Sequence, residues 1–363
     1  EIEDTTDPTV TVTALGSPGT NSIAVTVQVS DNESGMKENP TYTYYIKQSG
    51  EGSYTTPSGA SNITNAQYTF TGLTQTTSYD IKVEVNGDKA GNKGTDTLEN
   101  QKTDTVPGAS VGLETGNIIA SPAVWQNGKA SITLSTTTNY QIQYRINNTT
   151  EGSWSEGANS PITVGNLNHG DTVYARLWDG TNAGSDSSVS IEDNIAPSAP
   201  TINLSGTLGN NGYYRSNVTV AITAGSDEQS GVNQIRYSVS GAQTIAETTT
   251  TAGTTSANIT ISTDGTSTIT AYTIDKAGKV SGAKTQVVNK DSTAPNTASL
   301  TTGTVGETSI EVTAKGTDAT SGIYSYQFQR STTSSTTGFT TVATQTSTAT
   351  SYNYPYTGLT SGT

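Results

Sequence analysis

Cysteine is absent from the 363-residue sequence, and histidine occurs once, as His169. Without cysteine the chain has no disulfide framework, no thiolate zinc site and no cysteine nucleophile. A single histidine excludes a histidine-rich metal site and leaves at most one histidine-based catalytic triad. Because His169 falls in a predicted turn, we expect it to be a surface residue.

Charge is also scarce. Charged residues are 13% of the chain, and 17 Lys plus Arg against 31 Asp plus Glu give a net charge of −14. Binding to a nucleic-acid backbone needs clustered Lys and Arg, so the acidic balance argues against it. No run approaches the roughly 18–20 apolar residues of a membrane-spanning helix. We therefore expect no nucleic-acid partner and no direct membrane insertion.

Motifs for catalysis are missing as well. The sequence contains no Gly-x-Ser-x-Gly elbow, no P-loop and no dinucleotide-binding fingerprint. Acid pairs such as Asp227 and Glu228 are adjacent on a predicted loop, where they are expected to point apart into water, whereas the carboxylates of glycosidases converge across a cleft. We expect no catalytic residues in this chain.

What the sequence does have is the alternation of β-strands. Apolar residues, largely β-branched or aromatic, alternate with polar ones at residues 23–29, 79–85, 140–146 and 218–222. Short strands separated by Gly, Asn, Asp and Ser turns at roughly 8–12 residue spacing are typical of β-sandwiches. The sequence therefore predicts an all-β fold.

A repeated punctuation divides the chain. A short motif, in which an Asp is followed three or four residues later by a Pro, occurs four times and ends at Pro8, Pro107, Pro197 and Pro295. The intervals are roughly 90–100 residues, the size of one immunoglobulin-like sandwich. We predict four tandem sandwiches in an elongated array with short, stiff linkers, comprising residues 1–104, 105–193, 194–290 and 291–363.

The last repeat is predicted to be incomplete. Gly358-Leu359 matches Gly72-Leu73 of the first repeat, after which the first repeat has two further predicted strands. The fourth repeat is expected to lack its last two strands. This indicates a piece of a longer polypeptide; the alternative is a filament or phage-fibre subunit that a neighbouring subunit completes by donating strands.

Several segments resemble known modules. The segment from Leu73 to Tyr79 resembles the E–F corner of fibronectin type III domains, where a Leu fills the core and a Tyr makes the corner hydrogen bond. In the third repeat, residues 227–232 and 275–281 are similar to bacterial Ig-like modules of cell-surface proteins. The second repeat, around Trp154, resembles Ig-like modules appended to extracellular bacterial glycosidases. The resemblance implies a secreted bacterial surface protein.

Two loop motifs carry carboxylates. Asp-x-x-Ser-Gly occurs in the first, third and fourth repeats, and Asp-Lys-Ala-Gly in the first and third. In a sandwich these loops share one pole, facing the acidic linkers, and Ca²⁺ takes about 6–8 oxygen ligands. The alternative is that each Asp caps a tight turn and Gly supplies a positive φ. The calcium candidates are Asp31, Glu33, Asp88, Asp227, Asp275 and Asp318.

The second repeat contains all three Trp residues, at positions 125, 154 and 178. If the strand 173–177 turns its odd-numbered residues inward, its even-numbered ones form an outer face with the neighbouring strand 141–145. Such an aromatic and amide surface suits stacking on sugar rings; the alternative is a cation–π ladder in which Arg side chains cover the aromatic faces. The carbohydrate candidates are Gln141, Gln143, Arg145, Tyr174, Arg176 and Trp178.

The function predicted from these features is architectural: a non-catalytic stalk, spacer or fibre segment of a large extracellular bacterial surface protein. The alternatives are an adhesive or carbohydrate-binding segment centred on the second repeat, and a fibre subunit completed by strand donation. Expected partners are further domains of the same polypeptide, with cell-surface glycans or neighbouring subunits under the alternatives.

Overall fold

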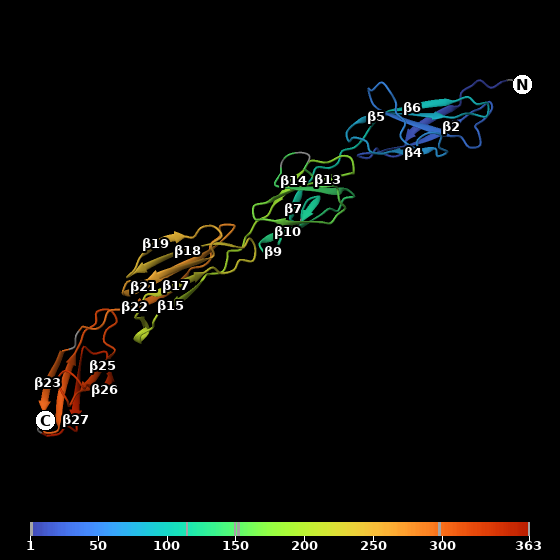
Figure 1. The fold of residues 1–363 in the computed structure, drawn as a ribbon. Helices are drawn as coiled ribbons and strands as arrows, with labels where there is room; N and C mark the ends of the chain where they lie inside the picture. The colour runs from blue at the N-terminus through green and yellow to red at the C-terminus, as the bar shows by residue number, and fades with distance from the viewer. Residues whose placement is uncertain (1–2, 114, 149, 151–152, 297–298, 362–363) are drawn as a thin grey trace. The chain divides into compact units, whose positions relative to one another are not determined.

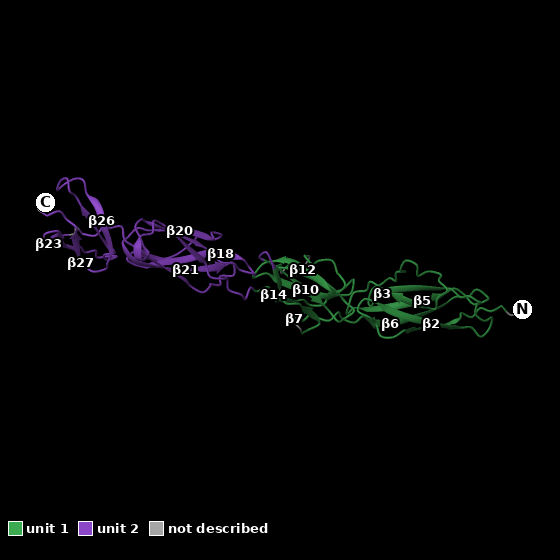
Figure 2. Cartoon of the chain, turned by 90° about the horizontal axis from the view of Figure 1, so that it is seen from below, with its two compact units in different colours: residues 1–125, 129–192 green, residues 126–128, 193–363 purple. Residues whose placement is uncertain are grey.

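The computed structural model describes residues 3–113, 115–148, 150, 153–296 and 299–361. The chain forms two compact units, coloured separately in Figure 2, residues 1–125 with 129–192 and residues 126–128 with 193–363. Strands make up the regular structure (Figure 1), and the sole helical element among the described residues is the short 3₁₀ turn η1 (Asn210–Gly212). The prediction of an all-β fold is confirmed.

The first repeat folds into two antiparallel three-stranded sheets, with strand orders β1-β2-β4 and β3-β5-β6. The segments 23–29 and 79–85, predicted from their alternation, lie in β2 and β5. Alternate residues point inward, so Val25 of one sheet and Val83 of the other are fully buried in one core. The strands are β1 (Thr9–Ala14), β2 (Ile23–Ser30), β3 (Tyr42–Gln48), β4 (Gln67–Phe70), β5 (Ser78–Val85) and β6 (Gly94–Lys102).

The corner between β4 and β5 has the hydrogen bond that the fibronectin-like resemblance implies. The side chain of Leu73 is buried in the core. The hydroxyl of Tyr79 accepts the backbone N–H of Thr74 at 3.0 Å. This bond fixes the loop that precedes β5, and Leu73 and Gln75 of that loop form hydrogen bonds with the second repeat.

The second repeat consists of one sheet in the order β12-β10-β8-β7, with β9 also pairing with β10, and a second sheet in the order β11-β13-β14. Leu134 and Leu177, from opposite sheets, are fully buried in its core. His169 lies in the turn between β12 and β13. The strands are β7 (Val111–Leu113), β8 (Ile118–Ala120), β9 (Val124–Gln126), β10 (Lys129–Ser135), β11 (Gln141–Ile146), β12 (Ile162–Leu167), β13 (Thr172–Trp178) and β14 (Ser187–Ser190).

The third repeat pairs the sheet β15-β17-β20 with the sheet β16-β22-β21-β18-β19. Val220 and Ile235, from opposite sheets, are fully buried in its core. The long strand β21 ends at Asp275, which places that carboxylate at one pole of the sandwich. The strands are β15 (Thr201–Ser205), β16 (Tyr213–Tyr214), β17 (Val218–Thr223), β18 (Val232–Gly241), β19 (Ile245–Thr249), β20 (Ser256–Ile261), β21 (Gly265–Asp275) and β22 (Lys284–Lys290).

The fourth repeat has a three-stranded sheet, β23-β24-β27, and the hairpin β25-β26. Its cluster of buried side chains is the smallest of the four in the described part of the chain, and it depends on aromatic rings. Phe328 stacks on Tyr354 with ring centroids 4.6 Å apart. The strands are β23 (Ser299–Val305), β24 (Ser309–Lys315), β25 (Ser325–Arg330), β26 (Thr340–Thr346) and β27 (Ser351–Thr357).

Because every Trp lies between residues 105 and 193, tryptophan fluorescence reports the unfolding of the second repeat within the full chain. Leu177 is 0% exposed. We expect Leu177→Ala to lower the stability measured by tryptophan fluorescence in urea by about 2–5 kcal/mol, since it opens a core cavity. Ile222→Ala, an equally buried site in the third repeat, should leave that transition in place. An equal effect of both variants would contradict separate cores.

Candidate functional site

Each of three linker aspartates accepts a hydrogen bond from the loop that carries Asp-x-x-Ser-Gly in the repeat that follows. The donor is always the backbone N–H of the Ser in that motif. The sequence prediction placed these loops near acidic linkers but did not include the linker aspartates as candidate residues; the recurring Asp-to-Pro punctuation was the signal that could have found them. The bonds join Ser34 to Asp4 at 3.1 Å, Ser230 to Asp193 at 3.0 Å and Ser321 to Asp291 at 3.1 Å.

The first aspartate of each Asp-x-x-Ser-Gly loop caps its own turn with one oxygen. Asp31 Oδ1 accepts the N–H of Gly35 at 2.6 Å, and Asp227 Oδ1 accepts the N–H of Gly231 at 2.7 Å. Both glycines have positive φ, +76° and +85°, a conformation that favours glycine. Turn capping, one of the two sequence interpretations, is therefore present; it uses Oδ1 and leaves Oδ2 to be accounted for.

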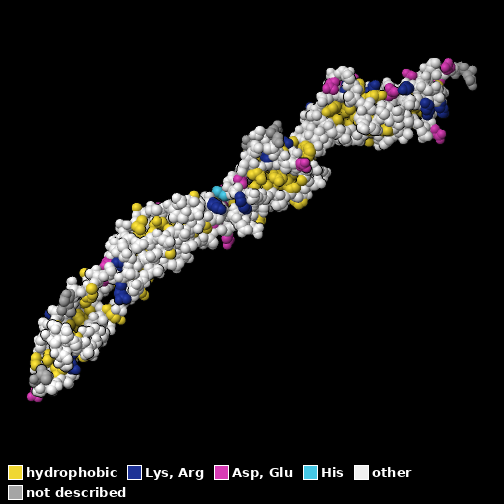
Figure 3. Space-filling model, viewed as in Figure 1, with side chains coloured by type: hydrophobic (Ala, Val, Ile, Leu, Met, Phe, Trp, Pro, Cys, Tyr) yellow, Lys and Arg dark blue, Asp and Glu magenta, His cyan; other side chains and the backbone are white. Residues whose placement is uncertain are grey.

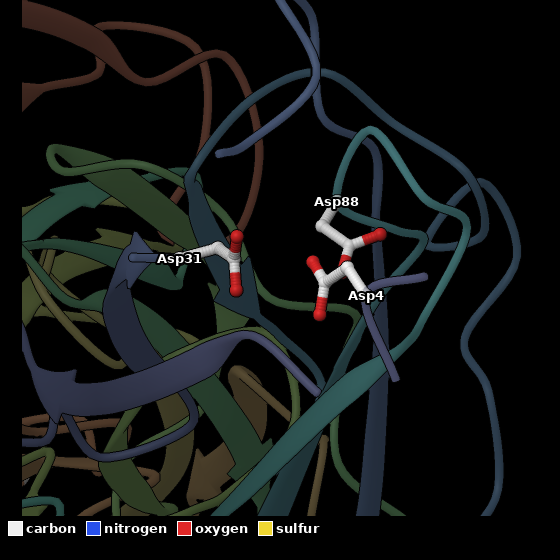
Figure 4. A group of neighbouring side chains, drawn as sticks. All are labelled: Asp4, Asp31 and Asp88. Atoms are coloured by element: carbon white, nitrogen blue, oxygen red, sulfur yellow. The ribbon is translucent and has the colours of Figure 1, made fainter. Parts of the chain in front are cut away.

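In the first repeat, three carboxylates meet at the linker pole. One oxygen from each of Asp4, Asp31 and Asp88 lies within 4.8 Å of the others. Figure 4 shows the side chain of Asp31 pointing toward Asp4 and Asp88. Glu33 is exposed and lies outside this group.

Asp88 has hydrogen-bond donors for both of its oxygens. Its Oδ1 accepts the backbone N–H groups of Gly91 at 2.6 Å and Asn92 at 2.9 Å, and the Asn92 side-chain amide donates to Oδ2 at 2.9 Å. Burial by itself would raise the pKa of Asp88, but the bonds from Asn92 and Gly91 hold it below its usual value. The protein alone therefore stabilises this buried anion.

In the third repeat, Asp193, Asp227 and Asp275 form a corresponding group with oxygens within 4.8 Å of one another. Asp275 is 0% exposed. Its Oδ1 accepts the backbone N–H of Lys279 at 2.7 Å, whereas the buried Oδ2 atoms of Asp275 and Asp227 have no hydrogen-bond partner in the described structure. Burial raises the pKa of Asp275, and repulsion from Asp193 and Asp227 adds to this against the bond from Lys279.

In the fourth repeat, Asp318 lies in a loop that also contacts Asp291. Its Oδ1 accepts backbone N–H groups from Thr320, Ser321 and Gly322 at 2.9, 2.8 and 3.1 Å. Burial opposes the effect of these bonds, which nevertheless lower the pKa of Asp318. Asp318 belongs to no three-carboxylate group among the described residues.

The structure therefore brings together four of the six calcium candidates as two pairs. Asp31 joins Asp88 and Asp227 joins Asp275, each with a linker aspartate that the sequence prediction did not include. Glu33 and Asp318 remain outside the groups. Calcium binding itself stays a prediction at this point.

The six carbohydrate candidates lie on one face of the sheet formed by β11 and β13. The register pairs Gln141 with Trp178, Gln143 with Arg176 and Arg145 with Tyr174. Gln143 and Arg145 are buried, which differs from the open surface expected from sequence. The alternation of the strands gave the correct face but contained no information on what covers it.

Trp154 covers the centre of this face. The guanidinium carbons of Arg145 and Arg176 lie 4.3 and 4.2 Å from the centre of its ring, and Arg145 also lies 5.0 Å from the ring of Tyr174. Arg145 Nη2 pairs with the Asp186 carboxylate at 2.7 Å. These contacts form the cation–π ladder considered as the alternative from sequence. A carbohydrate-binding role for the six residues stays a prediction.

Comparisons with known proteins identify no family for this chain. No protein-family model and no curated protein matches the chain. Among solved structures, a crystal structure of the chicken CNTN1 FN1-FN3 domains is similar over 77% of this chain and 97% of that chain, at 10% identity and a TM-score of 0.21. A TM-score this low carries no functional inference. Among the described residues, no helix has the length and apolar character to cross a membrane.

The cation–π ladder makes a stability prediction. Arg145→Met keeps an apolar stem but removes both the buried guanidinium and its bond to Asp186, whose side chain is about a third exposed. We expect the second repeat to lose about 1–3 kcal/mol, less than for a fully buried pair because water solvates Asp186. Urea unfolding followed by tryptophan fluorescence measures it.

The matched control is Lys129→Met in the same repeat. Lys129 is exposed, and its ammonium donates a hydrogen bond to the exposed Asn168 side chain at 2.6 Å. This variant should change stability by less than about 1 kcal/mol. If Arg145→Met is as mild as Lys129→Met, the ladder does not stabilise the repeat.

Proposed function

We propose that this chain is a non-catalytic structural segment, a stalk or spacer, of an extracellular bacterial surface protein. The proposal rests on two features. Four separate clusters of buried side chains each lie between the sheets of one repeat. In addition, the first and second repeats, which belong to one compact unit, are joined by several hydrogen bonds. A spacer needs self-supporting modules and joints that resist bending.

The observation that carries the proposal is the environment of Asn182. This side chain belongs to the loop after β13 of the second repeat and is 8% exposed. Its Nδ2 donates to the backbone carbonyls of Leu73 at 2.8 Å and Thr20 at 3.1 Å, and its Oδ1 accepts the N–H of Gln75 at 2.9 Å. One amide therefore binds two loops of the first repeat.

Gln75 completes the joint from the other side. Its Nε2 donates to the carbonyl of Ala183 at 2.7 Å, and its Oε1 accepts the N–H of Val106 in the linker at 2.7 Å. Asp179 Oδ2 also accepts the Thr20 hydroxyl at 2.5 Å. The linker and the 179–183 loop are thus both held to the first repeat. Bending at this joint would break these hydrogen bonds and leave those groups that stay buried without partners.

The surface composition supports the same proposal. Charged side chains are thinly distributed on the face seen in Figure 3, where neutral polar side chains and backbone predominate around smaller hydrophobic areas. Only 13% of the residues are charged. The net charge of −14 is therefore spread thinly over that face and not gathered into one charged patch, which suits a spacer with no concentrated site for a charged partner.

Spin labels test the joint in the full chain, since the absence of cysteine makes introduced cysteines unique. With Thr97→Cys on β6 and Thr163→Cys on β12, both exposed, electron–electron double resonance measures the distance between the first two repeats. We expect one narrow distribution, and a broader one after Asn182→Ala.

Gln67→Ala, at an exposed position on β4, is the control and should leave the distribution narrow. A distribution for the unmodified joint that is already as broad as that of Asn182→Ala would refute a stiff connection. The spacer proposal would then lose its main support.

A further inference from the structure

Two buried carboxylate oxygens in the third repeat have no compensating group. Oδ2 of Asp227 and Oδ2 of Asp275 are shielded from solvent and accept no hydrogen bond in the described structure. Their Oδ1 atoms are occupied by the backbone N–H groups of Gly231 and Lys279. Burying an anionic oxygen without a partner is strongly unfavourable, so either a proton or a bound cation has to balance it.

The first repeat shows what such a balance looks like. Residues 88–91 and 275–278 share the sequence Asp-Lys-Ala-Gly, but the next residue is Asn92 in the first repeat and Lys279 in the third. The Asn92 amide donates to Asp88 Oδ2 at 2.9 Å. Lys279 offers only its backbone N–H to Asp275. The third repeat therefore keeps the carboxylates and lacks the neutral donor.

Nearby cations of the protein do not fill this role. Neither Asp227 nor Asp275 forms an ion pair within 4.0 Å among the described residues. The Lys276 ammonium lies 3.6 Å from the point that a Cβ on Gly231 would occupy, and it forms no ion pair with either carboxylate in the described structure. The charge is instead concentrated further, because Asp193 and Asp227 both repel Asp275.

The geometry suits one cation of the size of Ca²⁺. Oxygens bound to the same Ca²⁺ at 2.3–2.6 Å are at most roughly 4.6–5.2 Å apart. The carboxylate oxygens of Asp193, Asp227 and Asp275 lie within 4.8 Å of one another. Three carboxylates with backbone carbonyls and water supply the hard oxygen ligands and irregular geometry that Ca²⁺ accepts, whereas Mg²⁺ requires a tighter octahedron.

We propose that Asp193, Asp227 and Asp275 bind one Ca²⁺, which holds the linker that enters the third repeat to the two loops at that end of its sandwich. Each residue comes from a different segment: the linker, the loop before β18, and the end of β21. Asp193 already accepts the N–H of Ser230 at 3.0 Å, so the linker is positioned before the ion binds. The proposal is independent of the Asn182 joint, and either can fail alone.

Hydrogen exchange of the full chain, measured by mass spectrometry of its peptides, tests each of the three segments of the site. Between EDTA and about 1 mM CaCl₂, a range typical of extracellular calcium modules, we expect saturable slowing of exchange in peptides covering residues 193–197, 227–232 and 275–280. Peptides covering residues 31–35 and 88–92 serve as the internal control and should not change. MgCl₂ at the same concentration should have a much smaller effect.

Two charge-removing variants keep the turns intact, because an Asn side-chain oxygen still accepts the capping bonds. Asp275→Asn and Asp227→Asn should each weaken Ca²⁺ binding, measured by titration calorimetry, by at least about 10-fold, because the number of charged ligands sets calcium affinity. In EDTA both should slow exchange in the same loops, since repulsion between the buried acids is relieved. Asp88→Asn, in the first repeat, should leave calcium binding unchanged.

Several results would overturn the proposal. The first is the absence of a saturable response to Ca²⁺ in the three loops. The others are a response to Mg²⁺ as large as that to Ca²⁺, and a calcium affinity that neither variant changes. If exchange in the three loops is as slow in EDTA as in calcium, the protein balances these charges without an ion.

Discussion

Period-2 alternation on paired sheets is the constraint on which the rest of this structure depends. Hydrophobic residues are only 31% of the chain, and those at the inward positions of the strands form the core of each sandwich. Val25 and Val83 in the first repeat and Val220 and Ile235 in the third are fully buried between facing sheets. The hydrogen bonds that join the first two repeats are made by polar side chains and backbone groups, among them Asn182 and Gln75.

Polar connections work here because their geometry satisfies buried groups. The linker aspartates accept the N–H of a Ser in the following repeat, and Asn182 and Gln75 bind carbonyls and N–H groups across the joint of the first two repeats. At the end of the third repeat, Asp264 accepts the buried ammonium of Lys290 at 2.6 Å and the N–H of Ser292 in the linker at 3.1 Å. Hydrogen bonds of this kind fix the orientation of one repeat relative to the next more closely than nonspecific apolar contact would.

The sequence allowed the strands and sheet faces to be predicted, because alternation is a local signal. The segments 23–29 and 79–85 became β2 and β5, and the outer face of β11 and β13 carries the predicted residues. The burial of Gln143 and Arg145 could not be foreseen, since it depends on Trp154 folding back over the sheet.

The joints and carboxylate groups were predicted only in part. Asp227 and Asp275 could be predicted as members of the carboxylate group from their loop motifs. Asp193 could not, because it precedes the third repeat in sequence and joins the group through its hydrogen bond with Ser230. Asn182 belongs to no motif that could have marked it. A single Asn in a loop is usually exposed, so its burial at the joint could not be foreseen. The difference between Asn92 and Lys279, one residue in otherwise matching loops, acquires meaning only from the environment of the aspartate beside it.

Stretching single molecules by force shows directly whether the repeats bury separate cores, as a spacer built of self-supporting modules requires. Separate cores predict separate unfolding events for the first three repeats, each lengthening the chain by roughly 300 Å, as expected for about 90 residues at 3.3–3.6 Å per residue. A single cooperative rupture of the whole chain, or extension without discrete events, would contradict this prediction.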